Sequence, residues 1–161
     1  MYWTSWPDDK IMRAQMDGTE VVEFLSGLDH PVGITIDFAE SRLFWTEYGA
    51  HNVCSSALDG SDIFVVADNE TETVDGGSAV RYPWGIALHD DYVYWGNYHG
   101  NGLHRCLKNG GEIETVLTDQ GHIQQLTSNE RNFHITRPND CESKNCGHIC
   151  VLTRSSCSCV H

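Results

Sequence analysis

Cysteine has the clearest chemical potential of any residue type in this chain, because five of the seven cysteines lie within the last 21 residues. The spacing is C-x4-C-x3-C-x6-C-x-C, formed by Cys141, Cys146, Cys150, Cys157 and Cys159. So dense a group in a segment with little apolar material is typical of disulfide cross-links, which persist in an oxidising compartment. A zinc knuckle built from Cys146, His148, Cys150 and His161 is the alternative chemistry for the same segment.

The rest of the chain offers little catalytic chemistry. It contains no nucleophile elbow, no pair of carboxylates at a useful spacing and no set of metal ligands outside the tail. We therefore predict a protein that is not an enzyme and that binds no cofactor and no metal.

The charge balance is strongly acidic, with 10 Lys and Arg against 23 Asp and Glu and a formal net charge of −13. This balance argues against nucleic acid or an anionic membrane as the partner and favours a basic protein ligand. Nine histidines add a pH-sensitive component, since their full protonation would change the formal charge from −13 to −4.

A short phrase recurs three times and indicates which elements position these residues. Each copy begins with an aromatic pair, at Tyr2-Trp3, Phe44-Trp45 and Tyr94-Trp95. In every copy an Asp-Gly or Asn-Gly turn follows 15 residues later, at Asp17-Gly18, Asp59-Gly60 and Asn109-Gly110. The period is 42 residues and then 50, the excess falling in the polar stretch 68–80. A fixed period of this length, built of short β segments, is the signature of propeller blades.

Within one period the sequence predicts four short strands, rich in β-branched and aromatic residues and bounded by turn residues. The second copy places them at Gly33–Phe38, Arg42–Thr46, Val53–Leu58 and Ile63–Ala67. The third copy places them at Gly85–Leu88, Tyr92–Gly96, Gly102–Leu107 and Ile113–Leu117. Because neighbouring blades cover both faces of each sheet, a continuous apolar run such as Leu43-Phe44-Trp45 is expected to be core on both sides.

These phrases resemble the YWTD repeat, the class B repeat of the low-density lipoprotein receptor. That repeat also carries a Pro-x-Gly-Ile phrase, present here as Pro31-Val32-Gly33-Ile34 and Pro83-Trp84-Gly85-Ile86, with a degenerate start at Gly121-His122-Ile123. The resemblance implies an all-β fold: part of a six-bladed propeller, about three blades over residues 1–136, followed by a truncated epidermal-growth-factor-like module over residues 137–161.

The resemblance also implies a disulfide pattern in the tail. Cys141 would pair with Cys150 and Cys146 with Cys157, leaving Cys159 unpaired. Calcium is not expected, since Asp140 is the single carboxylate just before the first of these cysteines. Cys54 and Cys106 fall in corresponding strands of adjacent blades, whose sheets pack about 10 Å apart, so we predict buried free thiols there.

The chain departs from the repeat at two charged positions. The final Asp of the motif is replaced by Ser5, Glu47 and Asn97, and its Arg position holds Arg13, Ser55 and Arg105. An ion pair between the two positions would therefore have to cross between blades, from Glu47 to Arg13 or Arg105.

Connectivity predicts where a ligand would bind. In an antiparallel blade the start of the first strand lies beside the end of the second. This places Val32, Trp84 and His122 on the same rim as Trp6, Tyr48 and Tyr98, which directly follow the variable motif position. Aromatic residues beside acids are typical anchors for a protein ligand. The candidate ligand-binding residues are Trp6, Glu47, Tyr48, Trp84, Tyr98 and His122; the alternative role for the aromatic residues is blade packing.

The function that the resemblance implies is extracellular ligand binding in a receptor of the low-density lipoprotein receptor-related family, either endocytic or acting as a Wnt co-receptor. The alternatives are a structural matrix propeller of the nidogen type and, less favoured, a propeller hydrolase. With no signal peptide and no apolar run long enough to cross a bilayer, the chain is expected to be a fragment on the extracellular side of a single-pass receptor, its remaining blades lying elsewhere. The sequon Asn69-Glu70-Thr71 predicts a surface glycan.

Overall fold

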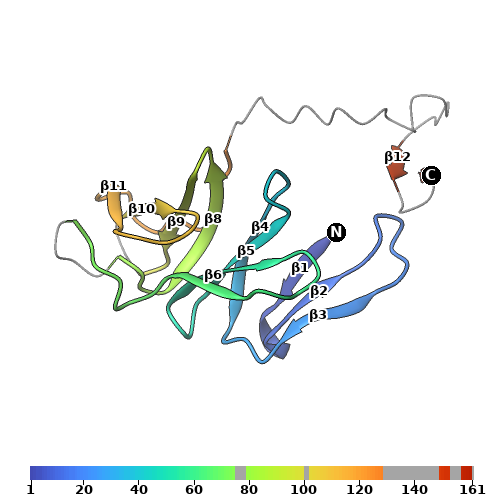
Figure 1. Ribbon diagram of the computed structural model, residues 1–161, viewed down its shortest axis with the longest axis horizontal. Helices are drawn as coiled ribbons and strands as arrows, with labels where there is room; N and C mark the ends of the chain where they lie inside the picture. The colour runs from blue at the N-terminus through green and yellow to red at the C-terminus, as the bar shows by residue number, and fades with distance from the viewer. Residues whose placement is uncertain (75–78, 100–101, 129–148, 153–156, 161) are drawn as a thin grey trace.

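The computed structural model describes residues 1–74, 79–99, 102–128, 149–152 and 157–160. Three antiparallel sheets follow one another along the chain and lie side by side (Figure 1). The first sheet contains β1 (Tyr2–Ser5), β2 (Lys10–Arg13) and β3 (Val22–Ser26). The second contains β4 (Pro31–Asp37), β5 (Arg42–Glu47), β6 (Asn52–Ala57) and β7 (Phe64–Ala67). The third contains β8 (Pro83–His89), β9 (Tyr92–Asn97), β10 (Leu103–Leu107) and β11 (Glu114–Leu117).

This arrangement confirms the predicted blade architecture. Each strand of the second and third sheets lies within two residues of its predicted bounds, and the strand order is sequential. The first sheet has three strands. The helical structure in the described residues is one 3-10 turn, η1 (Trp6–Asp8), and no helix there is long and apolar enough to cross a membrane.

The Asp/Asn-Gly turns set the register of the outer strands. Gly18, Gly60 and Gly110 adopt left-handed φ angles of 83°, 89° and 89°, a region that glycine enters without steric cost. In the second sheet the Asp59 carboxylate accepts the amide of Ser61 at 2.9 Å, which closes the turn locally. Asp17 accepts the amide of Thr19 in the same way in the first sheet, and the left-handed glycine recurs in all three turns, in accord with the fixed spacing from aromatic pair to turn.

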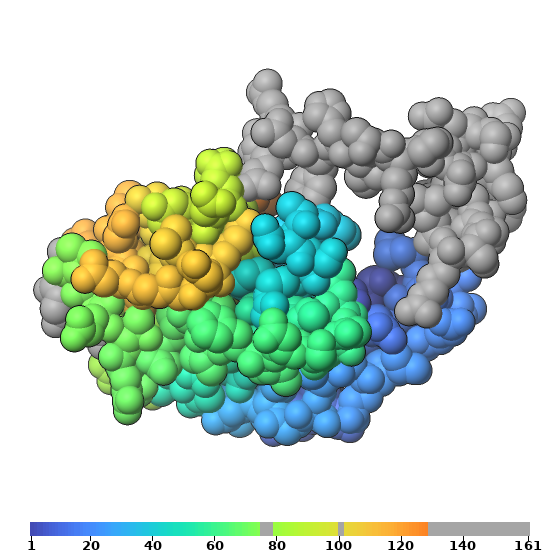
Figure 2. All heavy atoms as spheres, in the orientation of Figure 1, coloured from blue at the N-terminus to red at the C-terminus, as the bar shows by residue number. Residues whose placement is uncertain are grey.

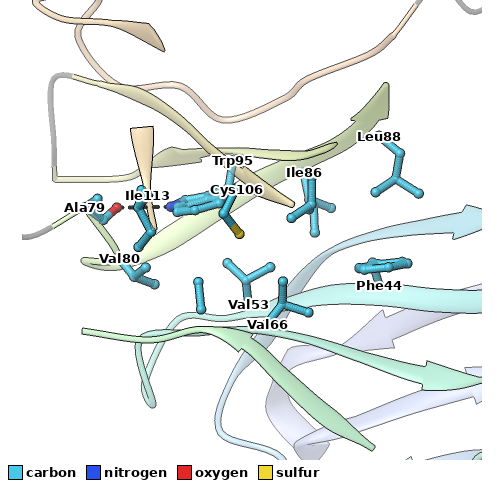
Figure 3. Packing of buried hydrophobic residues seen from close by; sticks show 12 residues of the cluster. Phe44, Val53, Val66, Ala79, Val80, Ile86, Leu88, Trp95, Cys106 and Ile113 are labelled. Atoms are coloured by element: carbon cyan, nitrogen blue, oxygen red, sulfur yellow. Dashed lines mark hydrogen bonds between the residues drawn. The ribbon is translucent and has the colours of Figure 1, made fainter. Parts of the chain in front are cut away.

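The largest core lies between the second and third sheets, whose segments pack side by side in Figure 2. Trp95 reaches it from the third sheet and Phe44 from the second, each with no exposed surface (Figure 3). Leu43 and Trp45 point the other way, into a separate core with Ile11 of the first sheet. The run Leu43-Phe44-Trp45 is therefore buried on both faces of the second sheet, as the sequence predicts.

Two small residues of the repeat, a threonine and a glycine, have a structural role at the junction between neighbouring sheets. Thr46 Oγ1 accepts the amide of Gly33 at 2.9 Å and donates to the carbonyl of Trp84 at 2.8 Å, which links the second sheet to the third. A Cβ atom on Gly33 would lie 2.2 Å from that carbonyl oxygen, so no larger residue fits. Thr4 makes the matching bond to the carbonyl of Val32 at 2.9 Å, between the first and second sheets.

A charged pair also joins the second and third sheets. The Nζ atom of Lys108 lies 2.7 Å from Oδ2 of the buried Asp37. Asp37 Oδ1 accepts the amides of Ala39 and Glu40, each at 3.0 Å, whereas Oδ2 has no well-aligned hydrogen bond and depends on the ion pair. Burial alone would raise the pKa of Asp37, but Lys108 and the two amides outweigh it, and the pKa lies below its ordinary value.

A separate hairpin is described near the C-terminus. It consists of β12 (Ile149–Leu152) and β13 (Cys157–Val160), with Cys150 opposite Cys159 in the backbone register. The predicted disulfides Cys141–Cys150 and Cys146–Cys157 lie outside the residues whose side chains are described. The same holds for the unpaired state of Cys159 and for the predicted boundary at residue 137.

Candidate functional site

Three aromatic side chains lie at one rim, each directly after the strand that carries the aromatic pair. Trp6 begins the turn after β1, Tyr48 follows β5 and Tyr98 follows β9. The Trp6 and Tyr48 rings lie 5.1 Å apart, and the Tyr48 and Tyr98 rings 6.1 Å apart. The sequence predicts this grouping from antiparallel connectivity, and the structure confirms it.

Trp84, the second residue of β8, lies at the centre of this group. Its ring is 4.7 Å from Tyr98 and 5.7 Å from both Trp6 and Tyr48. The side chain is half-buried, unlike the fully buried Trp45 and Trp95. Since its carbonyl is held by Thr46, the backbone is fixed while the indole extends to the rim. The predicted position of Trp84 beside the other three rings is confirmed.

Sequence reasoning missed four residues of the rim, and His30 and Tyr82 are two of them. Each directly precedes the proline of a Pro-x-Gly-Ile phrase, and each has a left-handed φ of 54°. Such a conformation costs a non-glycine residue about 1–3 kcal/mol and persists where the surroundings enforce it. Their carbonyls accept the amides of Tyr48 and Tyr98, at 3.0 and 2.8 Å. The position before the proline was the signal that could have identified both residues.

Histidines extend the rim at its far side. The His51 ring lies 4.4 Å from Tyr82, and its Nδ1 atom is 3.0 Å from the Tyr82 amide. His99 lies 4.7 Å from Tyr98, and His122 contacts both the ring and the carbonyl of Tyr98. We call the whole cluster the aromatic rim: Trp6, His30, Tyr48, His51, Tyr82, Trp84, Tyr98, His99 and His122.

Carboxylates flank one end of the aromatic rim. His30 Nδ1 lies 2.7 Å from Asp29 Oδ1, and the His30 amide donates to Asp9 Oδ1 at 3.0 Å. His30 in turn packs edge-on against Trp6, with ring centroids 4.8 Å apart. The Trp6 end of the rim therefore combines a large aromatic surface with two partly exposed acids.

Glu47 does not form the cross-blade ion pair that was considered from the sequence. It is buried, and its oxygens accept the Trp45 indole N–H and the Asp29 amide, both at 2.9 Å. Arg105 pairs instead with Glu114 of the neighbouring strand, at 2.7 Å. The indole needs a buried acceptor, and Glu47 supplies it within its own sheet. By accepting the Asp29 amide, Glu47 holds Asp29 in place at the rim.

A hollow of about 600 Å³ opens beside Trp84, between the inner strands β4 and β8 and the segment 124–127. Val32, Ile34 and Ile86 line it together with Trp84. Gln124, Gln125 and Thr127 line it as well, so its walls combine apolar and polar surface next to the aromatic rim.

The described residues of the polar insertion 68–80 lie at the junction of the second and third sheets. The middle of the insertion crosses to the third sheet, where Thr73 bridges to Ile113 and the Val74 amide donates to the Ile113 carbonyl at 3.0 Å. Ala79 then accepts the indole N–H of Trp95 at 3.0 Å (Figure 3). The insertion therefore braces the junction of the second and third sheets, and Asn69 remains exposed on it.

Cys54 and Cys106, the two cysteines whose side chains are described, are buried free thiols, as predicted. Burial, aided by the nearby Glu47 carboxylate, raises the pKa of Cys54, and burial raises the pKa of Cys106 to about 12. Neither thiol is therefore a nucleophile at neutral pH. In the part of the chain that the structure describes, no three His, Cys, Asp or Glu side chains are grouped to hold a metal.

Comparison with known proteins places this geometry in a family context. Residues 1–38 match the low-density lipoprotein receptor repeat class B. The chain is 31% identical over 147 residues to low-density lipoprotein receptor-related protein 5 of Mus musculus, covering 88% of this chain. It is 26% identical over 166 aligned residues to vitellogenin receptor Yl of Drosophila melanogaster, covering 99% of this chain. The chain spans about 8% of the length of each of these relatives.

Solved structures agree on the fold. A nidogen/laminin complex matches with a TM-score of 0.67 and 22% identity, over 80% of this chain and 48% of that one. Virginiamycin B lyase from Staphylococcus aureus matches with a TM-score of 0.58 and 22% identity, over 79% of this chain and 41% of the lyase. At these identities the likeness concerns the fold alone. Residues 1–38 are therefore a low-density lipoprotein receptor class B repeat, and over most of its length the chain is a distant relative of low-density lipoprotein receptor-related protein 5 and the vitellogenin receptors.

Proposed function

We propose that this chain is a non-enzymatic, extracellular ligand-binding segment of a receptor, and that the aromatic rim binds a protein ligand. The observation that carries the proposal is the contrast in burial: Trp84 and Trp6 keep exposed surface while Trp45 and Trp95 have none. Tryptophan and tyrosine offer large apolar area with few rotatable bonds, and such residues dominate binding energy at protein interfaces. Similarity to two kinds of receptor supports the same role.

The chemistry of the rim favours a ligand segment that carries an apolar residue and a basic residue. The apolar group would pack on Trp84, next to the hollow lined by Val32 and Ile86. The basic group would face Trp6, where Asp9 and Asp29 stand and a cation also gains from the ring face. A formal charge of −13 would speed the encounter with a basic partner, most strongly at low salt.

The receptor itself would be an endocytic or Wnt co-receptor-like protein of the low-density lipoprotein receptor-related family, single-pass and with this segment outside the cell. A nidogen-like matrix role is the second candidate, and its support is limited to the shared fold. Ligand-dependent uptake by cells carrying the receptor favours the first role, and retention in the matrix without uptake favours the second.

Two covalent features belong to the extracellular proposal. We propose that Cys141 pairs with Cys150 and Cys146 with Cys157, that Cys159 stays unpaired, and that Asn69 carries an N-linked glycan. Mass spectrometry of tryptic peptides from the secreted protein, before and after reduction and glycosidase treatment, tests both. Unmodified Asn69 or a Cys141–Cys146 bond would contradict these assignments.

The binding function can be tested with a displayed library of random peptides as the probe. Selection against the chain should yield binders enriched in aromatic or aliphatic residues together with Lys or Arg. These binders should fail to bind the double variant Trp6→Ala/Trp84→Ala but should still bind Ile63→Ala, which removes an exposed apolar side chain at the opposite end of the second sheet. Binders that tolerate the rim variant and are lost with the control would overturn the assignment.

A further inference from the structure

Two backbone amides at the aromatic rim are held by side chains from corresponding positions of neighbouring repeats. The His30 amide donates to Asp9 Oδ1 at 3.0 Å, and the Tyr82 amide donates to His51 Nδ1, also at 3.0 Å. Asp9 and His51 each lie seven residues after the start of the aromatic pair in their own repeat. Their backbones agree as well, with left-handed φ angles of 52° and 58°. The two hydrogen bonds are therefore versions of one contact, made with chemically different acceptors.

The hydrogen bond to His51 specifies the protonation state of its ring. A backbone amide nitrogen can only donate, so the Nδ1 atom must accept and cannot carry a proton. The ring is therefore neutral, with its hydrogen on Nε2. A protonated imidazole has donors at both nitrogens, so a second proton would remove the acceptor of the Tyr82 amide. A carboxyl group keeps an acceptor oxygen in either protonation state, so Asp9 holds its amide without this condition.

Tyr82 connects the second and third sheets at the rim. Its ring lies 4.8 Å from Tyr48 and 5.1 Å from His99. Its carbonyl accepts the Tyr98 amide at 2.8 Å, and the Tyr98 ring stacks 4.7 Å from Trp84. The left-handed φ of 54° at Tyr82 is a conformation that persists where the surroundings enforce it. Loss of the hydrogen bond to its amide should therefore disturb the rings that pack around Trp84.

The titratable and charged groups around His51 come from its own turn and from the segments packed against it. The Tyr82 ring meets the imidazole directly, with centroids 4.4 Å apart and planes at 84°. Further out lie Tyr48 and His99 beyond that ring, Arg81 just before it in the chain, and Asp29 against Gly49. The Asp29 carboxylate lies 2.7 Å from His30 Nδ1, so the ring that gains an anion on protonation is that of His30.

We propose that His51 is a positioning residue of the aromatic rim, whose unprotonated Nδ1 atom holds Tyr82 in place and whose protonation releases it. The Tyr82 end of the rim then loosens in mild acid, whereas the Trp6 end, held by a carboxylate, keeps its geometry. The effect on binding rests on the proposed function of the rim: a ligand packed on Trp84 should bind more weakly in mild acid.

Amide hydrogen exchange, followed by NMR on the isotope-labelled chain, tests the role of His51 without a ligand. The protection factor of the Tyr82 amide should fall about tenfold from about pH 7.5 to about pH 5.5, the interval in which an imidazole gains its charge. His51→Ala should lack this protection at both pH values. His51→Asn supplies a carbonyl acceptor that does not titrate and should keep the protection at both. His89→Gln, which removes a histidine at the end of β8, should behave as the parent.

A reciprocal substitution tests whether the acceptor alone makes the difference. Asp9→His places an imidazole at the equivalent position, with a left-handed backbone that His51 already adopts in its own repeat. The His30 amide should be protected at both pH values in the parent and should lose about tenfold of its protection in mild acid in Asp9→His. In the imidazole nitrogen spectrum of the parent at neutral pH, His51 Nδ1 should appear without a proton.

Three results would overturn the role of His51. They are equal protection of the Tyr82 amide at both pH values in the parent, the same loss in His51→Asn as in the parent, and a proton on His51 Nδ1 at neutral pH.

The effect on binding is measured separately, with one peptide selected against the rim as the probe. Over the same pH interval its dissociation constant should rise about tenfold more for the parent than for His51→Asn. Equal rises would contradict control of the rim surface by His51. Failure to select any peptide that depends on the rim would contradict the proposed function, and the exchange measurements would still decide whether His51 holds Tyr82.

Discussion

The aromatic residues inside the sheets and those of the rim come from the same repeat, yet their surroundings differ in kind. Phe44, Trp45 and Trp95 occupy the fixed aromatic pair and have no exposed surface. Tyr48 and Tyr98, each three positions beyond the tryptophan of its pair, are partly exposed and meet each other across sheets. The repeat thus uses its invariant spacing for packing, and the residues just past the second strand supply a surface that can vary without loss of the fold.

Hydrogen bonding separates the two groups as well. The indole N–H groups of Trp45 and Trp95 donate to Glu47 and to the Ala79 carbonyl within the protein. A buried indole needs such a partner, so these tryptophans are tied to their sheets at both the ring and the nitrogen. In Trp84 it is the backbone carbonyl that accepts a hydrogen bond, from Thr46. Its ring packs against the other rings of the rim.

The largest effect on stability is expected from the interior group. Trp95→Ala should lower the free energy of unfolding by about 3–5 kcal/mol, because it leaves a large cavity in the core between the second and third sheets. Trp84→Ala should cost clearly less. Urea denaturation of both variants measures the difference, and equal losses would erase the distinction between core and rim.

A glycine at the junction connects the two groups. Gly33→Ala should destabilise the chain by about 3 kcal/mol, since its Cβ atom would lie 2.2 Å from the Trp84 carbonyl oxygen and backbone must move. The shift should also displace the Trp84 indole and change its fluorescence emission. Gly27→Ala is a useful control for glycine replacement, because nothing lies within 4 Å of its Cβ position and the cost there is limited to its left-handed φ of 69°. A Gly33→Ala chain as stable as the parent would refute the close approach of the sheets.

The ion pair between the sheets should have a smaller effect. Lys108→Met should cost about 1–3 kcal/mol at neutral pH, because the buried Asp37 oxygen loses the one cation beside it. Since the pKa of Asp37 is lowered in the folded state, its stabilisation is present above the unfolded pKa of a carboxyl and is lost as pH falls through the folded value. Acid denaturation of the parent and the variant should therefore converge at low pH, and curves that stay parallel would count against this pair.

Much of the fold could be predicted from the sequence because its signals are local and repeated. The aromatic pairs and the Asp-Gly turns each fix a strand or a turn by themselves, and their spacing sets the blade. The rim partners Trp6, Tyr48, Trp84 and Tyr98 followed from strand direction alone.

Other contacts depend on side-chain geometry that no repeat encodes. His30 and Tyr82 belong to the rim through a left-handed backbone before proline, which sequence disfavours. Glu47 bonds an indole of its own strand rather than an arginine of the next sheet. The insertion 68–80 pairs with Ile113, a contact made across sheets by residues with no counterpart in the other repeats.

The smallest expected effect is on the pH dependence of stability, where a buried histidine should differ from the histidines of the rim. His104 is buried within 6.0 Å of Trp95 and 3.3 Å from the Thr115 hydroxyl, and burial lowers its pKa. Below the unfolded histidine pKa the unfolded chain binds more protons, so stability should fall slightly as pH drops from there toward the folded value. His104→Gln should remove this component of the pH dependence, whereas His99→Gln should leave it. A pH profile unaltered by His104→Gln would assign the component to other groups.

The central claim is that Trp84 serves binding while its interior counterparts serve the fold. Isothermal titration of one rim-selected peptide into the parent, Trp84→Ala and Ile63→Ala chains tests this claim directly. The account predicts a loss of about 1–3 kcal/mol for Trp84→Ala, the range of an interface anchor, with affinity unchanged for Ile63→Ala and with Trp84→Ala still folded. Equal affinity for the parent and Trp84→Ala would contradict it.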